Sequence, residues 1–527
     1  MTRVGIVGAG PVGLIMAMYL ARYGVATTVY ERASGPCPTP RGSTHNARTM
    51  EHYRVLGFAR EVDKRGLPAG HSAGICFRDR YNGTLLADAD WPNSPTDAEA
   101  WRAGLHILSR SPERMLRANQ CRVEPLLFEL ARAREDIDLR LEHEVVEVVE
   151  TASVVTLAVE PRSGPAYRQQ HDFVVGCDGA RSLVRAALGA QLTGSSALPV
   201  GVLGAGSTAA HVRIKGLNGQ GLDQQRRWAN WVFNEDAAFN LISLDGEDDF
   251  SLLTGQFGGD AHPEQIRELI TRNTLGNVQV DVVDTRRWEG GIALVADRYA
   301  SQRLFLAGDA AHLFTPHGGF GMNTGIDDTA NLAWKLAAVT NGWAHPGVLD
   351  SYDVERRPVA TANTLSAREH GQALAAIPRS GNGSGHRLHD YAVDTMATED
   401  IAFGADYSTS PLTTTVPAGS RAPHFWRNAY ARGWGDSLCE RLGPGITLLH
   451  WPSERTLVNA FHTHVTSLGI PSTSYALPDM SVRDTYGGDY ALVRPDGHLC
   501  WVGNDLVPDT VTDALLRATA RHEPGAA

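Results

Sequence analysis

Residues 304–337 combine a carboxylate and a glycine-rich loop in a spacing that could support flavin chemistry. An apolar strand is predicted over 304–307, and it leads directly into Gly308 and Asp309. A loop rich in glycine and proline follows, and a helix then begins. A carboxylate at the end of a strand can accept hydrogen bonds from a sugar-like chain. Free N–H groups at a helix N-terminus favour negative charge, which a reduced flavin carries at its N1–C2=O edge. The alternative is an ordinary strand–loop–helix corner.

A second candidate site lies at the N-terminus, where a glycine-rich turn separates a predicted strand from a predicted helix. The turn has the sequence GAGPVG, and a glutamate ends the following strand. Glycine allows the backbone to approach a pyrophosphate, and the glutamate can accept hydrogen bonds from an adenosine ribose. Because a carboxylate there would repel a 2′-phosphate, FAD or NAD fits better than NADP. The residues concerned are Gly8, Gly10, Pro11, Gly13 and Glu31.

The elements that position these motifs are predicted from hydrophobic periodicity. A strand, a helix and a second strand over 3–30 form a βαβ start, and a strand over 173–176 leads into Asp178 and Gly179. Residues 190–290 are glycine-rich and strand-like, with Trp228, Trp231 and Phe233 as an aromatic group. Further predictions are helices over 41–60 and 122–134, hairpin strands over 139–160, and an alternation of strands and helices from 418 to 521.

Composition and charge exclude several classes of function. The 527 residues carry a net charge of −11 and contain no basic run, so we expect no nucleic-acid partner. The apolar run after the first glycine turn is too short to span a bilayer, and we expect no membrane partner. The six cysteines form no CxxC pair and no Cys/His cluster with zinc spacing, so no metal site is predicted. A reducing, cytoplasmic setting fits best.

A second GxGxxA-type sequence occurs at 204–209. It could in principle form another nucleotide site, for NAD(P)H. Glycines at 216, 219 and 221 leave no room for a full crossover helix, so a loop or a sheet corner is the better interpretation.

Three segments in order resemble the FAD-dependent aromatic hydroxylases, the class A monooxygenases of the p-hydroxybenzoate hydroxylase superfamily. They are GAGPVG with YER near the N-terminus, VVGCDGARSLVR over 174–185, and RLFLAGDAAHLFTPHGGFGMNTGIDDTANLAWKL over 303–336. The sequence SYDVERRPVA over 351–360 adds to the resemblance, which covers about residues 1–370. It implies non-covalent FAD, with NADPH or NADH as the co-substrate.

The resemblance also implies roles for individual residues in FAD binding. Glu31 and Arg32 would hold the adenosine part, and Arg41 the pyrophosphate. Gln120 resembles a flavin-contacting polar residue, and Asp178 with Gly179 resembles a motif linked to both FAD and NAD(P)H. At the other end of the cofactor, Asp309 would bind ribityl hydroxyls, the backbone of Gly319, Gly321, Met322 and Asn323 would face the flavin, and Pro316 would lie beside C4a, where oxygen adds.

The implied reaction inserts one oxygen atom from O2, through a flavin C4a-hydroperoxide, into an aromatic, phenolic or polycyclic polyketide-like molecule. Activating a phenol calls for a base or a positive field. The phenol-hydroxylase pattern expects an acidic residue where this chain has Gly42 and Ser43, so His45 and His317 are left as candidate bases. A substrate that needs no enzymatic deprotonation is the alternative. Baeyer–Villiger insertion, epoxidation and oxidative decarboxylation on the same scaffold also stay open.

The predicted fold class is α/β, with α+β character overall. A Rossmann-like FAD-binding domain would comprise 1–70, 105–190 and 290–375, and an inserted β-sheet substrate domain 71–104 and 191–289. A linker is expected over 376–417. Residues 418–527 resemble the thioredoxin-like C-terminal domain of the phenol- and polyketide-hydroxylase branch, without a CxxC, which predicts an interface or stabilising role. A homodimer is left open.

Other classes fit less well. A flavin disulfide reductase would need a CxxC near the first helix, which this chain lacks. A flavin halogenase would carry a WxWxIP-type segment, whereas the tryptophans at 228 and 231 have a different spacing and no following proline. A non-enzymatic binding protein on this scaffold would tolerate loss of Gly308-Asp309, which is intact.

Overall fold

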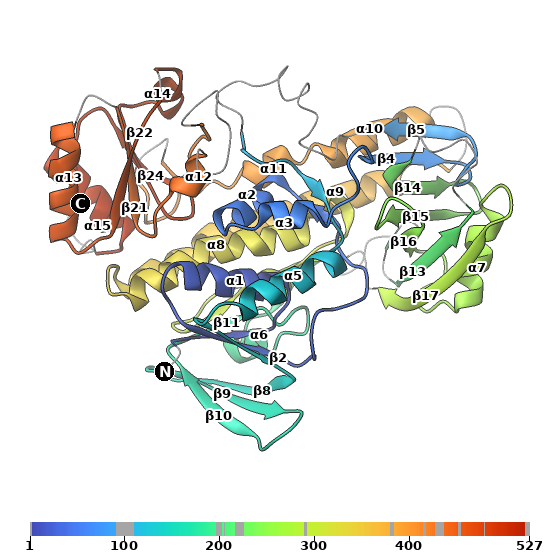
Figure 1. Ribbon diagram of the computed structural model, residues 1–527, viewed down its shortest axis with the longest axis horizontal. Helices are drawn as coiled ribbons and strands as arrows, with labels where there is room; N and C mark the ends of the chain where they lie inside the picture. The colour runs from blue at the N-terminus through green and yellow to red at the C-terminus, as the bar shows by residue number, and fades with distance from the viewer. Residues whose placement is uncertain are drawn as a thin grey trace.

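A five-stranded parallel sheet lies at the centre of the fold, which we describe from a computed structural model (Figure 1). Its order is β19 (Leu304–Leu306), β11 (Phe173–Gly176), β1 (Val4–Val7), β2 (Thr27–Glu31) and β7 (Ile137–Leu141). Strands β19, β11 and β1 are buried apolar runs, as expected for parallel strands covered on both faces, and β2 is buried up to its last residue although it begins with two threonines. The structure describes residues 3–90, 110–195, 203–204, 206–216, 226–288, 292–379, 384–414, 418–426, 437–451, 455–478 and 480–521.

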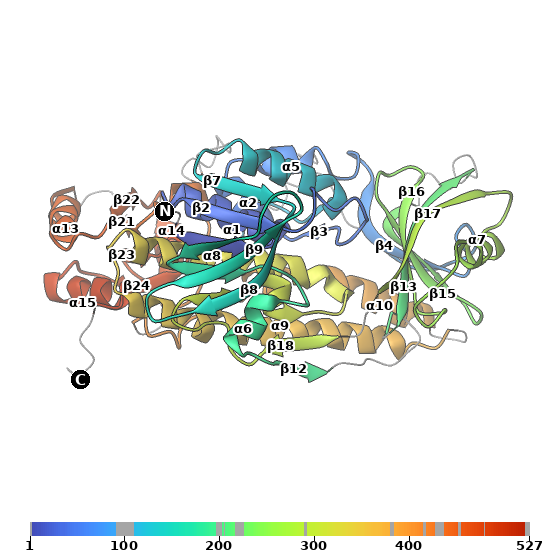
Figure 2. The same cartoon turned by 90° about the horizontal axis from the view of Figure 1, so that it is seen from below.

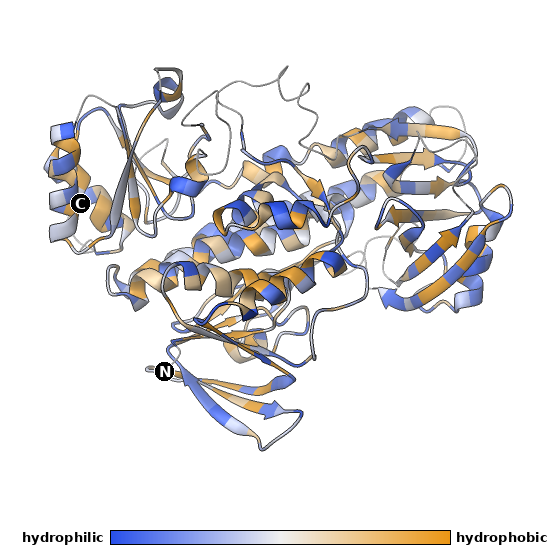
Figure 3. Ribbon diagram, in the orientation of Figure 1, coloured by the Kyte–Doolittle hydropathy of each residue, from blue (hydrophilic) through white to orange (hydrophobic). Residues whose placement is uncertain are grey.

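Helices surround this sheet and build its core. Helix α1 (Pro11–Arg22) packs against the long helix α8 (Phe320–Thr340), and α8 packs against α9 (Ser351–Ala375). Figure 3 shows apolar residues along the helices and strands that meet here. The remaining helices of this unit are α2 (Ala47–Val55), α3 (Ala59–Asp63), α5 (Gln120–Arg132) and α6 (Leu183–Leu188), with short 3₁₀ turns at Gly308–Ala310, His317–Gly319 and Pro346–Asp350.

Three small sheets complete the central unit. The antiparallel sheet β10-β9-β8 lies below the parallel sheet in Figure 1. The pair β3-β6 brings residue 44 opposite residue 117. The strands are β8 (His143–Glu150), β9 (Val155–Pro161), β10 (Tyr167–His171), β3 (Thr44–His45), β6 (Leu116–Arg117), β12 (Leu192–Ser195), β18 (Ala293–Ala296) and β20 (His312–Leu313).

A seven-stranded sheet forms one end of the molecule (Figures 1 and 2). Helix α7 (Pro263–Arg272) covers one face through Ile266 and Ile270, and α10 (Ser384–Met396) covers the other through Leu388 and Tyr391. The strand order is β17 (Gln279–Trp288), β13 (Ser207–Lys215), β16 (Asp249–Thr254), β15 (Ala238–Ser243), β14 (Arg227–Phe233), β4 (Ser72–Arg78) and β5 (Leu85–Ala89).

The opposite end is a four-stranded sheet of order β22-β21-β23-β24. Strand β21 is parallel to β22 and antiparallel to β23. The elements are α12 (Leu438–Arg441), β21 (Ile446–His450), α13 (Arg455–Ser467), β22 (Ser472–Ala476), α14 (Met480–Tyr486), β23 (Tyr490–Val493), β24 (Leu499–Gly503) and α15 (Pro508–Ala518). This is the small α/β unit expected from the sequence, and its thioredoxin-like character stays a prediction.

The structure corrects two features of the predicted domain map. The segment predicted as a linker contains α10 and α11 (Glu399–Phe403), and α10 is a packed element because Leu388, Tyr391, Ala392 and Met396 recur on one helical face. Strand β12 falls within the predicted substrate domain but pairs with β18, which in turn pairs with β20. It therefore belongs with the central unit. Residues 91–109, also assigned to the substrate and FAD domains, lie outside the described residues.

Two further predictions concern local features. The glycine sequence at 204–209 leads directly into β13, and the Ser207 hydroxyl donates to the Gly204 carbonyl at 2.7 Å. The described residues of this sequence therefore lead into a strand, as the sequence favoured, and none of them is helical. Within the described residues, no helix is long and apolar enough to cross a membrane, and no group of three metal-ligating side chains comes together.

Candidate active site

The predicted site residues follow the carboxyl ends of four neighbouring strands. Gly8 follows β1, Glu31 ends β2, Asp178 follows β11, and Asp309 follows β19. Because these strands are parallel and adjacent, their carboxyl ends meet at one edge of the sheet. The fold thus brings together motifs that lie about 300 residues apart in the sequence.

The glycine turn is shaped by close backbone contacts. Gly8 has φ +101°, and a Cβ there would lie 2.4 Å from the Cys177 carbonyl oxygen. A Cβ on Gly13 would lie 2.0 Å from the Gly8 oxygen. Gly10 differs, because no atom lies within 4 Å of the place its Cβ would take. It precedes Pro11, the first residue of α1, so the backbone is open where a phosphate would approach the helix N-terminus.

Glu31 holds this turn in place. One carboxylate oxygen accepts from the Ala9 N–H at 2.8 Å and the other from the Ala33 N–H at 2.8 Å. Each carboxylate oxygen has a second lone pair, so the group can still accept hydrogen bonds from a ribose. Arg32 is exposed beside it.

Asp178 caps the start of α6 and keeps one oxygen without a partner. Its Oδ2 accepts from the Leu183 N–H at 2.7 Å and the Val184 N–H at 3.2 Å. Its Oδ1 is buried and has no hydrogen-bond partner among the described residues. Burial raises the pKa of this carboxyl. Gly179 follows with φ +80° and open space at its Cβ position.

The loop that carries Arg41 is hydrogen-bonded to the start of α5, where Gln120 lies. The Gln120 N–H donates to the Gly42 carbonyl at 2.8 Å, and Asn119 Nδ2 donates to the Arg41 carbonyl at 3.2 Å. The Gln120 amide donates to Glu124 within the same helix. Arg41 is exposed, and its guanidinium makes no hydrogen bond or ion pair within the described part of the chain.

Asp309 is exposed, and no described group donates a hydrogen bond to its carboxylate. The surrounding protein raises the pKa of this carboxyl by desolvation, while His312 and then Arg41 act in the opposite direction. The carboxylate is therefore accessible although protein surrounds it closely. These are the properties of an acceptor that faces a ligand.

The N-terminus of α8 starts from two left-handed glycines. Gly318 has φ +77° and Gly319 φ +68°, and a Cβ on Gly319 would lie 2.7 Å from Thr44 Cβ. The first backbone N–H groups of the helix, including those of Gly321 and Met322, have no intrahelical acceptor. They and the helix dipole can stabilise a negative charge.

The side chain of Asn323 joins this helix start to the N-terminal unit. Its Nδ2 donates to the Thr44 carbonyl at 2.9 Å and the Gly319 carbonyl at 2.6 Å. Its Oδ1 accepts from the Asn46 N–H at 2.9 Å and the Thr49 hydroxyl at 2.6 Å. All its polar atoms are engaged, which leaves only the backbone of Asn323 for a cofactor.

The two candidate bases differ sharply. His317 follows Pro316 and is 5% exposed, and neither ring nitrogen has a partner among the described residues. His45 is fully buried, with Nδ1 3.1 Å from the Tyr53 hydroxyl and Nε2 3.0 Å from the Ala118 carbonyl. The geometry corrects the expectation for His45, because both its nitrogens are occupied in joining β3 to its neighbours. Burial lowers its pKa to about 4.

A buried ionic cluster behind the site escaped the sequence analysis. Asp328 Oδ2 is 2.7 Å from His312 Nε2, and its Oδ1 accepts from Arg356 Nε at 2.8 Å. Asp328 also accepts from the Gly308 N–H at 3.2 Å, which fixes the corner that carries Asp309. The available signal was the presence of charged residues such as Asp328 and Lys335 within the apolar helix predicted after the glycine loop.

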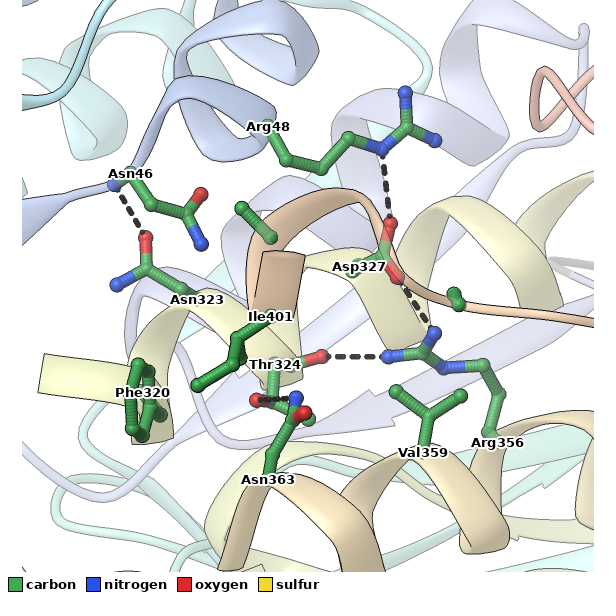
Figure 4. A pocket seen from close by; sticks show the side chains of 12 residues that line it. Asn46, Arg48, Phe320, Asn323, Thr324, Asp327, Arg356, Val359, Asn363 and Ile401 are labelled. Atoms are coloured by element: carbon green, nitrogen blue, oxygen red, sulfur yellow. Dashed lines mark hydrogen bonds and ion pairs between the residues drawn. The ribbon is translucent and has the colours of Figure 1, made fainter. Parts of the chain in front are cut away.

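A polar pocket between α2, α8, α9 and α11 adjoins this cluster (Figure 4). Asp327 accepts from Arg48 Nε at 3.2 Å and from Arg356 Nη1 at 2.5 Å. Asn363 Nδ2 donates to the Thr324 hydroxyl at 3.0 Å. These lining side chains are paired with one another. Their hydrogen bonds and ion pairs hold α8 against α2 and α9, and they leave few polar groups for a substrate to bind.

The residues at the sheet edge fit FAD. Gly10 leaves open space at a helix N-terminus, Asp178 presents an orphaned buried oxygen, and Asp309 presents an accessible carboxylate. These groups match what a dinucleotide requires, because backbone N–H groups donate to phosphate and carboxylates accept from hydroxyls.

Comparison with known proteins agrees with this fit. Residues 1–367 match the family model described as FAD binding domain. A putative polyketide hydroxylase of Streptomyces halstedii is 30% identical, over 97% of this chain and 95% of that protein. A 4-methyl-5-nitrocatechol 5-monooxygenase of Burkholderia sp is 31% identical, over 98% and 97%. The rebeccamycin biosynthetic enzyme RebC with reduced flavin is 27% identical, with a TM-score of 0.85 and 99% coverage of both chains.

The chain belongs to the FAD-binding-domain family. Within it, the chain is an FAD-dependent monooxygenase of the aromatic hydroxylase class.

Proposed function

We propose that the chain binds FAD non-covalently and, with NADPH or NADH and O2, inserts one oxygen atom into a hydroxylated, polyketide-like aromatic ring. The observation that carries this is the convergence of Gly10, Asp178 and Asp309 with the α8 N-terminus at one sheet edge. The relatives support the substrate class, because one is named a putative polyketide hydroxylase and another a 4-methyl-5-nitrocatechol 5-monooxygenase. A reducing compartment fits the six cysteines, which are all free.

In this proposal one group of residues binds the adenosine and pyrophosphate part of FAD, and a second group binds the ribityl chain and the flavin ring. Gly8, Gly10 and Gly13 with α1 would hold the pyrophosphate, aided by Arg41, and Glu31 with Arg32 the adenosine ribose. Gln120 and Asp178 with Gly179 would line the middle of the cofactor. Asp309 would accept hydrogen bonds from the ribityl chain. The N–H groups at the start of α8 would face the flavin ring.

When bound, the flavin would supply electron transfer from the nicotinamide and activation of O2. The protein positions the ring, excludes water and handles protons. Pro316 and His317 would border the reacting face. We place the substrate between this face and the seven-stranded sheet, where Trp228 lies over the guanidinium of Arg117 at 3.6 Å.

The test is a substrate screen with purified holoenzyme. We expect a yellow protein that releases FAD on denaturation and consumes NAD(P)H faster with hydroxylated polycyclic aromatics. Mass spectrometry under ¹⁸O2 should find one labelled oxygen in the product, as a new ring hydroxyl. Hydrogen peroxide is measured in parallel to separate coupled from uncoupled turnover. A protein that takes up no FAD, or a labelled product without a new ring hydroxyl, contradicts the proposal.

A further inference from the structure

Arg356 of α9 is a fully buried arginine that donates to the backbone of α8 near the start of that helix. Its Nη2 donates to the Thr324 carbonyl at 3.2 Å, as Figure 4 shows. Inside a helix this carbonyl also accepts from the N–H group four residues later, so the guanidinium occupies its second lone pair. A hydrogen bond from a charged donor is roughly twice as strong as a neutral one. Arg356 therefore polarises the peptide group that joins Thr324 to Gly325.

That peptide group leads back to the N-terminus of α8 through one further peptide group. The Gly325 N–H donates to the Gly321 carbonyl in the regular pattern of the helix. The peptide group of the Gly321 carbonyl also carries the Met322 N–H, which has no intrahelical acceptor. Hydrogen bonds in such a chain polarise and strengthen one another. The positive charge of Arg356 thus makes the Met322 N–H a stronger donor.

Two carboxylates of α8 set how much of this positive charge acts on the helix. Arg356 Nε donates to Asp328 at 2.8 Å, and Nη1 donates to Asp327 at 2.5 Å. Although burial raises the pKa of Asp327, Arg356 and His52 hold it well below its usual range. The Asp327 carboxylate is therefore ionised at neutral pH and offsets part of the charge of Arg356.

The first turns of α8 pack directly against the proposed flavin site. A Cβ on Gly325 would lie 2.8 Å from the Gly308 Cα, and the Gly308 N–H donates to Asp328 at 3.2 Å. Gly308 precedes Asp309, the proposed ribityl acceptor. The peptide groups that Arg356 polarises therefore lie against the corner that carries Asp309.

We propose that Arg356, a positioning residue that acts through the Thr324 and Gly321 peptide groups, raises the reduction potential of the bound flavin, and that Asp327 lowers it. The inference rests on the proposed function, because it presumes that the N–H groups at the start of α8 face the N1–C2=O edge of FAD. Two-electron reduction with uptake of one proton leaves a negative charge at that edge. Arg356 stabilises this charge, whereas the oxidised flavin is neutral there and gains little.

The test is the midpoint potential of FAD in the holoenzyme, measured against a reference dye during slow anaerobic reduction by xanthine and xanthine oxidase. A unit charge about 10 Å from another, in a partly buried setting, changes an equilibrium by about tenfold. For a two-electron couple, tenfold corresponds to about 30 mV. We therefore expect the potential to fall by about 30 mV in Arg356→Gln and to rise by about as much in Asp327→Asn.

A second measurement separates this effect from a loosening of the helix. The dissociation constant of oxidised FAD should stay close to the wild-type value in both variants, because the oxidised ring carries no charge at N1. Arg494→Gln is the matched control, since Arg494 is also fully buried and pairs with Glu355 at 2.6 Å. Its guanidinium meets α8 at the Trp334 ring, 5.3 Å away, and about 18 Å along the helix from Met322. Arg494→Gln should therefore keep the wild-type potential.

Opposite shifts in Arg356→Gln and Asp327→Asn are the outcome that a structural role alone would not produce. An unchanged potential in either variant, or shifts in the same direction, overturns the inference and leaves the proposed function standing. If Arg356→Gln does not fold, Asp327→Asn decides alone, and a potential that does not rise overturns the inference. A wild-type protein that takes up no FAD overturns the proposed function and this inference with it.

Discussion

Arg494 of the C-terminal unit and Glu355 of α9 form a bidentate ion pair in which neither side chain is exposed. Nη1 lies 2.6 Å from Oε1, and Nη2 lies 2.8 Å from Oε2. Glu355 also accepts from Lys335 of α8 at 2.6 Å, and Arg494 donates to Asp496 in its own turn. The C-terminal unit is therefore linked through Glu355 to Lys335 of α8, the helix whose N-terminus we propose as part of the flavin site. It is an integral part of the enzyme.

Arg494→Met should destabilise the protein strongly. Removing one partner of a buried pair leaves the other charge uncompensated, at a cost of about 3–5 kcal/mol. Here Lys335 would still face Glu355, so the lower end of that range applies. The measurement is the urea midpoint of the holoenzyme. Arg517→Met is the control, because its pair with Asp513 at 2.9 Å is about 40% exposed and should matter by less than about 1 kcal/mol.

Two glycines of the first turn should respond oppositely to alanine. In Gly13→Ala the new methyl would overlap the Gly8 carbonyl, so the protein should lose its fold or its solubility. In Gly10→Ala the methyl meets no protein atom and φ is −67°, so the apoprotein should keep its unfolding temperature. FAD affinity of Gly10→Ala should nevertheless fall at least tenfold, because the methyl would enter the pyrophosphate space. FAD fluorescence titration and circular dichroism separate the two outcomes. An unchanged affinity in Gly10→Ala would move the cofactor away from this turn.

The sheet-edge motifs could be predicted because their signals are local. A strand, a glycine turn and a helix need only a few adjacent residues, and strand order then brings Gly8, Asp178 and Asp309 to one edge. The resemblance to the aromatic hydroxylases indicated that these separate motifs belong to one FAD site. The positions of β1, α1, β2 and α8 follow the same logic.

Features that depend on distant partners could not be predicted. His45 was a candidate base by its position, and only the fold shows that Tyr53 and Ala118 occupy both its nitrogens. Helix α10 was missed because its sequence is mostly polar and follows a glycine-rich segment. Its few apolar residues lie on one face, and only the fold shows that this face is buried. The ion pair between Glu355 and Arg494 joins residues 139 positions apart, and no local sequence pattern predicts it.

Asp309→Asn should weaken FAD retention while leaving the fold intact. The amide has nearly the same size but replaces an anionic acceptor with a neutral one, and hydrogen bonds to charged groups contribute roughly 1.5–3 kcal/mol. We therefore expect the FAD dissociation constant to rise about tenfold to a hundredfold. The measurement is FAD fluorescence on titration of the apoprotein. Asp172→Asn, at an exposed position before β11, should bind FAD as wild type does. Equal affinity in both variants would remove Asp309 from the ribityl site.

Glu113→Gln should remove a pH dependence of stability between about pH 4.5 and 7. Burial raises the pKa of Glu113 from 4.5 to about 7, even though Arg54 donates to it at 2.8 Å. The folded state therefore binds a proton that the unfolded state has released, and this contribution is complete below pH 4.5 and lost as pH rises through 7. The loss amounts to at most about 3 kcal/mol. Urea midpoints across this window should fall less with pH in Glu113→Gln than in wild type, and Glu144→Gln, at an exposed position of β8, should follow wild type. A parallel fall in all three proteins would show that Glu113 is already ionised at pH 5, with Arg54 outweighing its burial.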